Sequence, residues 1–384
     1  MLGKACSARD MIKKIYDQKS FLLISTLFML FALASCKKDN NNTTKTSQLA
    51  AVATPVPLGL YEADSGEYKE MDVAISQVGT KTVDYGLVFD TGSGGMVIDA
   101  NGILPASMVT STGFNFTQDS TIVNGITVTN HTTELDYGVD NNTETKVYGN
   151  LAYAPVTIGD QNGSIVIKRL PFFLYYKAVE SDGTVLLPHY FDTFGVSEEY
   201  ITFPGSSFIT SPFSYYNPGN GLTKGFKMAQ LNAANFTANF IYVPGAVTLG
   251  LTADDISSSS GFVMSNMTYS AGDGYNPILP MTVTYGSKTV STQALFDTGT
   301  SGYNYIEDPG ATKDLSLLPQ GTNISLLTNT NFGYAFTTQK ADNLTYVENP
   351  NTTGAQFSDF SIEFFLGNEY LMDFTHNKLG LKNN

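Results

Sequence analysis

The sequence predicts an all-β protein built from two related units. Short runs rich in Val, Ile, Thr, Tyr and Phe alternate with turns of Gly, Asn, Asp and Ser, as in a β-sandwich or barrel. Segments with the period of an amphipathic helix are few and short, at residues 227–235 and 253–257. The clearest strand candidates are residues 71–76, 124–130, 154–159, 164–176, 239–243 and 279–286.

A stretch of 17 residues occurs twice. Residues 79–95 read GTKTVDYGLVFDTGSGG and residues 286–302 read GSKTVSTQALFDTGTSG, with nine identical positions, no gap and an offset of 207. Chance rarely aligns a Gly, a Lys-Thr-Val and a Phe-Asp-Thr-Gly in one register. The repeat therefore indicates two homologous units, each of which contributes one Asp-Thr-Gly.

The N-terminal segment has the pattern of an export signal. Residues 21–35 carry no charge and follow three lysines, which predicts a signal peptide over residues 1–35 rather than a membrane span. The stretch ends Leu-Ala-Ser-Cys at Cys36 and resembles the bacterial lipobox, which implies cleavage before Cys36 and lipidation of that cysteine. A simple membrane anchor and cleavage at a nearby position are the alternatives.

The segment after Cys36 predicts a tether. Residues 36–57 are polar, then small, then rich in proline, as in a disordered linker. Lys37, in place of Asp, is typical of sorting to the outer membrane, so we expect a lipid-anchored protein of the bacterial cell envelope that faces the periplasm or the outside. The rest is long enough for two lobes, which we expect at residues 58–225 and 226–384.

Composition excludes several classes of function. The formal charge of −14 argues against nucleic acid, whose phosphates need basic patches. The second cysteine, Cys6, lies within the expected signal peptide, so the mature chain would form no disulfide. The three histidines have no Ser or Cys nucleophile motif and no zinc spacing around them. The acidic and amide run at residues 140–142 lacks a calcium-loop pattern, so we expect no metal and no cofactor.

What remains is the pair Asp90 and Asp297. Each follows an apolar run and precedes a Thr-Gly, so each should lie at a strand end where Gly92 or Gly299 allows a tight turn. If a two-fold axis brings the loops together, the two carboxyl groups share a proton and titrate as one unit. The ionised member can then act as a general base on water while the protonated member acts as an acid.

The chain resembles the pepsin-like aspartic proteases. The resemblance rests on both Asp-Thr-Gly motifs and on further segments in order: VGTKTVDYGLVFDTGS (78–93), ELDYG (134–138), FDTFGVS (191–197), GAVTLG (245–250) and FFLGNEYLMDFTHNKLGL (364–381). It covers residues 60–384. It implies a bilobal acid protease fold, with two related six-stranded β-barrel-like lobes and a central cleft.

The resemblance also implies roles for individual residues. Asp90 and Asp297 would be the catalytic dyad of a monomeric endopeptidase that takes an extended peptide. Residues 191–197 and the apolar-Gly of the closing segment would brace the two loops. At the matched positions, Thr91 and Thr298 would lock the loops, and Gly92 and Gly299 would lie in the turns. Ser93 and Thr300 would hydrogen-bond the carboxylates. Tyr137 with Gly138 would form the flap, and Tyr148 is the second choice for the flap tyrosine.

The sequence also departs from the family pattern. It has no tryptophan, and Val97 stands where the family often has the Trp that supports the flap tyrosine. Gly94-Gly95 replaces the usual Ser and larger residue, and the segment from Tyr137 to Gly149 is longer and more polar than a compact flap tip. The alternative function is therefore a non-catalytic lipoprotein of the same fold that binds peptide or glycan at the cell envelope.

Overall fold

The computed structural model describes residues 52–66, 68–138, 144–339 and 343–384. The expected signal peptide, Cys36, most of the tether and the polar run 140–142 lie outside the described residues. Within the described ranges, no helix has the length and apolar character needed to cross a membrane. The first strand begins at Val56, so the last two residues of the expected tether belong to a strand.

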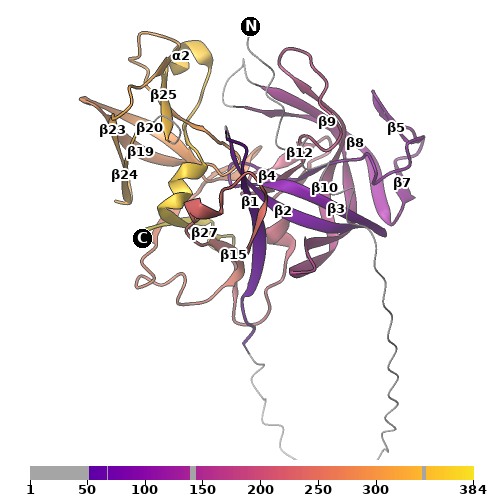
Figure 1. Cartoon of the computed structure of the whole chain (residues 1–384). Coiled ribbons are helices and arrows are strands. Elements are labelled where there is room, and N and C mark those ends of the chain that lie inside the picture. Colours follow the sequence, from indigo (N-terminus) through magenta and orange to yellow (C-terminus); the bar gives the residue numbers. More distant parts are fainter. Residues whose placement is uncertain (1–51, 67, 139–143, 340–342) are drawn as a thin grey trace, which may run out of the picture. The chain divides into compact units, whose positions relative to one another are not determined.

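Almost all of the regular structure is β, in one sheet of 14 strands and one of eight (Figure 1). The larger sheet has the order β16 (Val263–Asn266), β28 (Lys378–Asn383), β27 (Asn368–Asp373), β14 (Thr223–Met228), β15 (Ile241–Leu251), β1 (Val56–Asp64), β2 (Lys69–Val78), β3 (Lys81–Asp90), β11 (Thr193–Val196), β4 (Gly94–Asp99), β10 (Gly163–Glu180), β9 (Thr145–Asp160), β8 (Ile126–Tyr137) and β7 (Ser120–Val123). The chain's first and last strands thus share a sheet, and β14 spans the expected lobe boundary at residue 225.

The smaller sheet belongs to the later part of the chain and is orange to yellow in Figure 1. Its order is β22 (Leu315–Leu317), β25 (Leu344–Glu348), β21 (Tyr303–Glu307), β26 (Ser358–Phe360), β20 (Lys288–Phe296), β19 (Leu279–Tyr285), β23 (Asn323–Thr328) and β24 (Gly333–Thr337). Short hairpins pair β5 (Val109–Thr110) with β6 (Gly113–Phe114), β12 (Ile201–Phe203) with β13 (Ser207–Ile209), and β17 (Thr268–Ser270) with β18 (Gly274–Asn276). The helical turns are η1 (Pro212–Tyr215), η2 (Ala233–Asn235), α2 (Pro350–Thr353) and η3 (Ile362–Leu366).

Neither of the two predicted helices forms. Residues 227–235 contain the end of β14 and the three-residue turn η2, and residues 253–257 form turns. Lys227 and Met228 pair instead with Thr248 and Val247 of β15. The pairing partners of a sheet override a weak helical period of this length.

The 17-residue repeat folds twice into the same hairpin. Gly79 joins β2 to β3 and Gly286 joins β19 to β20, each as the first residue of a two-residue turn. Their φ angles are 61° and 57°, which favours glycine and suits the right-handed twist of a hairpin. The second strand of each hairpin carries its aspartate at or just past its end, so the repeat places the two Asp-Thr-Gly loops equivalently.

A buried phenylalanine anchors each of these loops. Phe89 lies against Phe213 and Phe226 with ring centroids 6.2 and 6.1 Å apart, and Phe296 stacks on Phe364 at 4.0 Å. All five rings are at most 2% exposed. Because each anchor directly precedes its aspartate, the packing of the core fixes where each carboxyl group emerges.

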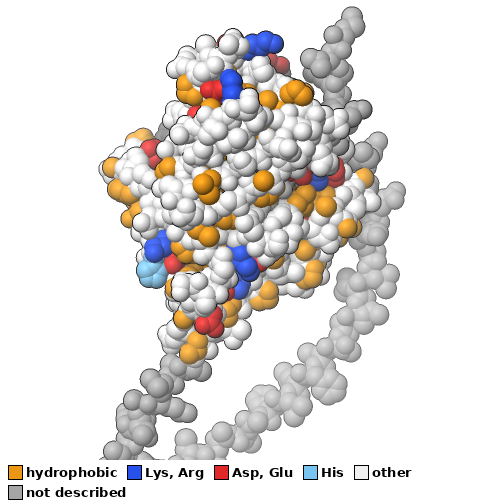
Figure 2. Space-filling model, turned by 90° about the vertical axis from the view of Figure 1, so that its left-hand side faces the viewer, with side chains coloured by type: hydrophobic (Ala, Val, Ile, Leu, Met, Phe, Trp, Pro, Cys, Tyr) orange, Lys and Arg blue, Asp and Glu red, His pale blue; other side chains and the backbone are white. Residues whose placement is uncertain are grey.

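The chain carries few charges for its length. On the face shown in Figure 2, acidic and basic side chains stand in small groups and most of the area is uncharged. The whole chain is only 15% charged, which agrees with this view.

Candidate active site

Asp90 is the last residue of β3, and its carboxyl group accepts hydrogen bonds from its own loop. The backbone N–H groups of Gly92 and Ser93 donate to Oδ1 at 2.7 and 3.1 Å, and the Ser93 hydroxyl donates to Oδ2 at 2.5 Å. The side chain is 6% exposed. These donors engage both carboxyl oxygens and fix the orientation of the group.

Asp297 follows β20 and has the matching environment. The N–H of Gly299 donates to Oδ1 at 2.7 Å, and the Thr300 hydroxyl lies 2.9 Å from Oδ2. Ser93 and Thr300 thus contact the two carboxyl groups in the way that the resemblance implies. Among the described residues, the second loop supplies one fewer backbone donor to its aspartate than the first.

The two loops are tied together by reciprocal hydrogen bonds. The N–H of Thr91 donates to Thr298 Oγ1 at 3.1 Å, and the N–H of Thr298 donates to Thr91 Oγ1 at 3.0 Å. Each hydroxyl in turn donates to the opposite strand, to the carbonyl oxygens of Phe296 (2.8 Å) and Phe89 (2.6 Å). Both threonines are at most 1% exposed, so four buried hydrogen bonds hold the aspartates at one place.

The turn glycines let the carboxyl groups approach each other. A Cβ on Gly92 would lie 2.6 Å from the Asp297 carboxyl group, and one on Gly299 would lie 2.9 Å from that of Asp90. Each glycine is therefore packed against the opposite aspartate, and no larger residue fits. Burial, the charge of Asp90 and a hydrogen bond to Asp90 hold the pKa of Asp297 well above its usual range. The pair can thus retain one proton.

A short strand braces each loop from behind. β11 runs parallel to β3 and antiparallel to β4, and β26 stands in the same relation to β20 and β21. A Cβ on Gly195 in β11 would lie 2.6 Å from the Ser93 carbonyl oxygen, so glycine is required there. This is the segment 191–197 that the sequence assigned to the first brace.

The second brace was assigned to the wrong residues. Phe360 pairs with Phe296 as Phe194 pairs with Phe89, so Ser361 occupies the place of Gly195. The N–H of Asp297 donates to the Phe360 carbonyl oxygen at 2.8 Å, whereas Gly367 follows η3. An apolar-Gly pattern does not locate the second brace in the sequence, because this brace has no glycine.

The structure adds a third carboxyl group that the sequence did not reveal. Asp359 in β26 is 1% exposed, and its Oδ2 lies 2.7 Å from the Thr300 hydroxyl, which also contacts Asp297. Burial is the main cause that raises the pKa of Asp359 to about 7; the Thr300 hydrogen bond opposes the rise and the charge of Asp90 adds to it. The only sequence signal is an acidic residue within an apolar run, at Asp359-Phe360.

Tyr137 lies beside the first loop. It is the last residue of β8, and its ring meets Phe191 edge-on with centroids 4.9 Å apart. Burial, and next the charge of Asp90, raise the pKa of its hydroxyl, which hydrogen-bonds Ser93. Tyr137 also packs against the buried cluster that contains Val97, so this valine occupies part of the support expected of a Trp. Gly138 is the last described residue before the gap at 139–143.

Tyr148, the second flap candidate, lies elsewhere on the hairpin. It pairs with Glu134 across β8 and β9, and the ammonium group of Lys177 lies 4.2 Å from its ring centroid. These contacts are those of an ordinary strand residue. Among the described residues, no group of three or more His, Cys, Asp and Glu side chains is placed to hold a metal ion.

Comparison with known proteins identifies the fold. No protein-family model and no curated protein matches the chain. An aspartic proteinase from Irpex lacteus matches in structure with a TM-score of 0.51 at 16% identity, over 87% of this chain and 98% of that one. The chain therefore has a pepsin-like bilobal fold.

Two seed proteins share the same fold. Basic 7S globulin from soybean matches with a TM-score of 0.53 at 10% identity, over 86% of this chain and 95% of that one. Conglutin gamma, a basic 7S globulin from lupine seeds, matches with a TM-score of 0.52 at 12% identity, over 86% and 96%. At such identities the likeness concerns the fold alone, so any activity must be argued from the site.

Proposed function

We propose that the protein is an aspartic endopeptidase in which Asp90 and Asp297 activate a water molecule for peptide hydrolysis. The observation that carries this proposal is the contact between the carboxyl groups of Asp90 and Asp297. Their two loops are held together by the reciprocal hydrogen bonds of Thr91 and Thr298. The glycines packed against both carboxyl groups allow the close approach that a proton-sharing pair needs. The chain shares its fold with a named aspartic proteinase, so the fold is compatible with this reaction.

The reaction follows from one proton shared by two acids. The ionised carboxyl group removes a proton from the water, whose oxygen attacks the peptide carbonyl carbon, while the protonated carboxyl group gives its proton to the carbonyl oxygen. When the tetrahedral intermediate collapses, the carboxyl group that took the water proton gives it to the amide nitrogen, which leaves as an amine, and a hydroxyl group of the intermediate returns a proton to the other carboxylate. Aspartic proteases are the general example of such a split pair, since like charges about 3 Å apart do not both ionise. The raised pKa of Asp297 fits the role of the initial acid.

A second candidate is a non-catalytic protein that binds peptide or glycan with the same cleft. It is favoured by the two neighbours that are named as globulins and not as proteinases. This candidate expects binding without turnover. The two candidates therefore differ in a single measurement.

The deciding experiment is hydrolysis of a denatured protein by the purified chain over a range of pH, with and without pepstatin, beside Asp90→Asn. We expect cleavage in acid solution that pepstatin inhibits and that falls by at least a factor of about 10³ in the variant, because the pair acts as a unit. Unimpaired cleavage by Asp90→Asn would exclude the dyad. A folded wild-type chain that cleaves nothing at any pH would favour the binding protein.

We further propose that the protein is anchored in the bacterial outer membrane through lipid on Cys36. The support is the apolar stretch 21–35, the Leu-Ala-Ser-Cys that ends it and the lysine that follows. A tether of about 20 residues would let the folded body reach substrates near the membrane. The expected state is a monomer.

A further inference from the structure

A polar groove begins beside the first Asp loop and continues along the later part of the chain. It consists of two adjoining hollows of about 410 and 620 Å³ that share Gln293 and Gln356 in their walls. The nearer hollow includes Glu199, whose carbonyl oxygen would lie 2.1 Å from a Cβ on Gly94, the residue after Ser93. Gln293 lies on β20 four residues before Asp297, so the groove begins roughly 13 Å along the strand from the second aspartate.

The nearer hollow is acidic. Glu199 and Asp273 line it, and the backbone bridge between Glu199 and Gly274 holds these two segments together. Burial, with additional effects of the charges of Asp90 and Asp273, raises the pKa of Glu199 to about 8. The neighbouring charges of Asp90 and Asp273 favour the neutral form of Glu199, and a cation bound beside Glu199 would favour its ionised form and be stabilised by it.

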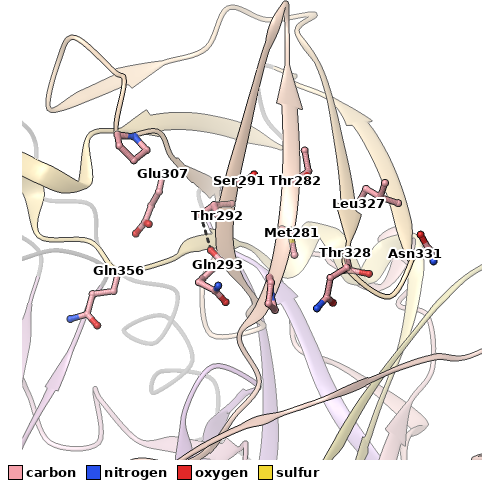
Figure 3. A pocket seen from close by; sticks show the side chains of 13 residues that line it. Met281, Thr282, Ser291, Thr292, Gln293, Glu307, Leu327, Thr328, Asn331 and Gln356 are labelled. Atoms are coloured by element: carbon pink, nitrogen blue, oxygen red, sulfur yellow. Dashed lines mark hydrogen bonds between the residues drawn. The ribbon is translucent and has the colours of Figure 1, made fainter.

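The farther hollow holds a buried carboxyl group with an unused oxygen. Glu307 lines it and is 7% exposed, and its Oε1 has no hydrogen-bond partner. In Figure 3 this carboxyl group points into the space between Gln356 and Gln293. Burial and the neighbouring Glu348 raise the pKa of Glu307 to about 7. An unsatisfied buried acceptor of this kind costs free energy unless a donor binds to it.

The rest of the groove supplies acceptors and no cation. Amide and hydroxyl side chains from β19, β20 and the segment after β23 line the farther hollow. Within the described part of the chain, no lysine or arginine lines either hollow. The groove is also too extended for one ion, and no group of three acidic side chains among the described residues is arranged around a metal position.

We propose that this groove binds lysine or arginine side chains of the peptide held at the aspartates. One basic side chain pairs with Glu199 and Asp273 next to the loops, and a second reaches Glu307 farther along. A long alkyl stem with a terminal cation suits a polar hollow with a buried carboxyl group at its wall. This inference rests on the proposed function only because it takes the ligand to be a peptide. It specifies peptides with lysine or arginine side chains as the substrate class.

The test measures binding, so that it does not depend on hydrolysis. The full chain with Asp297→Asn is titrated with fluorescein-labelled ten-residue peptides in which one lysine replaces glutamine at each position in turn. We expect lysine at one or two positions to improve affinity by about tenfold over glutamine, because a desolvated charge pair contributes to that extent. High salt should reduce this preference.

Variants assign the preference to the groove. Glu199→Gln should abolish it at one peptide position and Glu307→Gln at another, while Asp254→Asn, which removes an exposed carboxylate outside the groove, should leave both unchanged. Since Glu307 is buried and its variant could misfold, Gln293→Lys serves as the second variant. Gln293 is exposed. A lysine at this position would place the protein's own ammonium group in the groove and remove the preference for lysine peptides over glutamine peptides.

The outcomes separate this inference from the proposed function. If lysine and glutamine peptides bind equally at every position, or if the preference survives all three groove variants, the groove proposal is wrong even if the wild-type chain hydrolyses protein. If the chain hydrolyses nothing but shows the lysine preference and loses it in the variants, the groove stands and the protease proposal fails.

Discussion

Thr300 has one hydroxyl hydrogen and two carboxyl groups to contact. Its Oγ1 lies 2.9 Å from Asp297 and 2.7 Å from Asp359, so it can donate to only one of them. If both were ionised, the second contact would be a repulsion between lone pairs. The arrangement is satisfied when Asp359 is protonated and donates to Thr300, which then donates to Asp297. The raised pKa of Asp359 agrees with this state.

Asp359→Asn should therefore shift the pH dependence of both stability and activity. The folded protein holds a proton on Asp359 that the unfolded chain releases near the ordinary aspartate pKa of 3.8, so wild-type stability should fall as the pH rises from about 4 to about 7. Asparagine reproduces the neutral form and can donate to Thr300, so the variant should lose this part of the decline. Chemical denaturation across this window measures the effect.

The same variant should lose activity at a lower pH than the wild type. An ionised Asp359 raises the pKa of Asp297, so its removal should move the upper pH limit of hydrolysis down. An unchanged pH profile in a stable variant would show that Asp359 does not act on the dyad. Asp254→Asn, at an exposed position, is the matched control for the loss of one carboxylate.

At the scale of the elements, the two brace strands, β11 and β26, determine the positions of the two Asp-Thr-Gly loops. The first brace depends on glycine because β11 passes within contact of the Ser93 carbonyl group. Gly195→Ala would place a Cβ 2.6 Å from that oxygen, which is backbone and must move. We expect a loss of about 1–3 kcal/mol in the free energy of unfolding, together with a large loss of hydrolysis, because Ser93 orients Asp90.

The control for this brace is Gly272→Ala. A Cβ on Gly272 would meet nothing within 4 Å, so this variant should keep both stability and hydrolysis. Thermal unfolding and a peptide assay measure the two effects. Equal behaviour of the two alanine variants would show that the brace tolerates displacement.

The braces also show what could be predicted from the sequence. The Asp loops at the strand ends and the first brace repeat a pattern of glycine and apolar residues that requires one geometry, so their positions could be predicted from the sequence. The second brace was placed wrongly because Ser361 takes the position of the glycine, and only the pairing of Phe360 with Phe296 reveals it. Asp359 was missed for the same reason, since its neighbours are set by strand register and not by spacing along the chain.

At the scale of the whole molecule, two long-range features were beyond the sequence. The groove combines segments around residues 199, 273, 293, 307 and 356, which are brought together only by the packing of separate strands. The larger sheet likewise joins β1 to β15 and β14 to β27, far apart in the chain. Alternating burial along a single strand, as in β19, could be predicted because it depends only on the alternation of apolar and polar residues within that strand.

The proposed lipid anchor on Cys36 can also be tested at the scale of the whole molecule, and Cys6 provides the control. Cys36→Ala removes the thiol that would carry lipid, so the protein should move from the membrane fraction to the soluble fraction and lose incorporation of labelled fatty acid. Cys6→Ala removes the other cysteine and should change neither, because Cys6 lies in the segment that signal cleavage before Cys36 would discard. Membrane association and labelling that persist in Cys36→Ala would exclude this anchor. Soluble Cys36→Ala protein that still hydrolyses peptides would show that the lipid sets the location of the enzyme and not its chemistry.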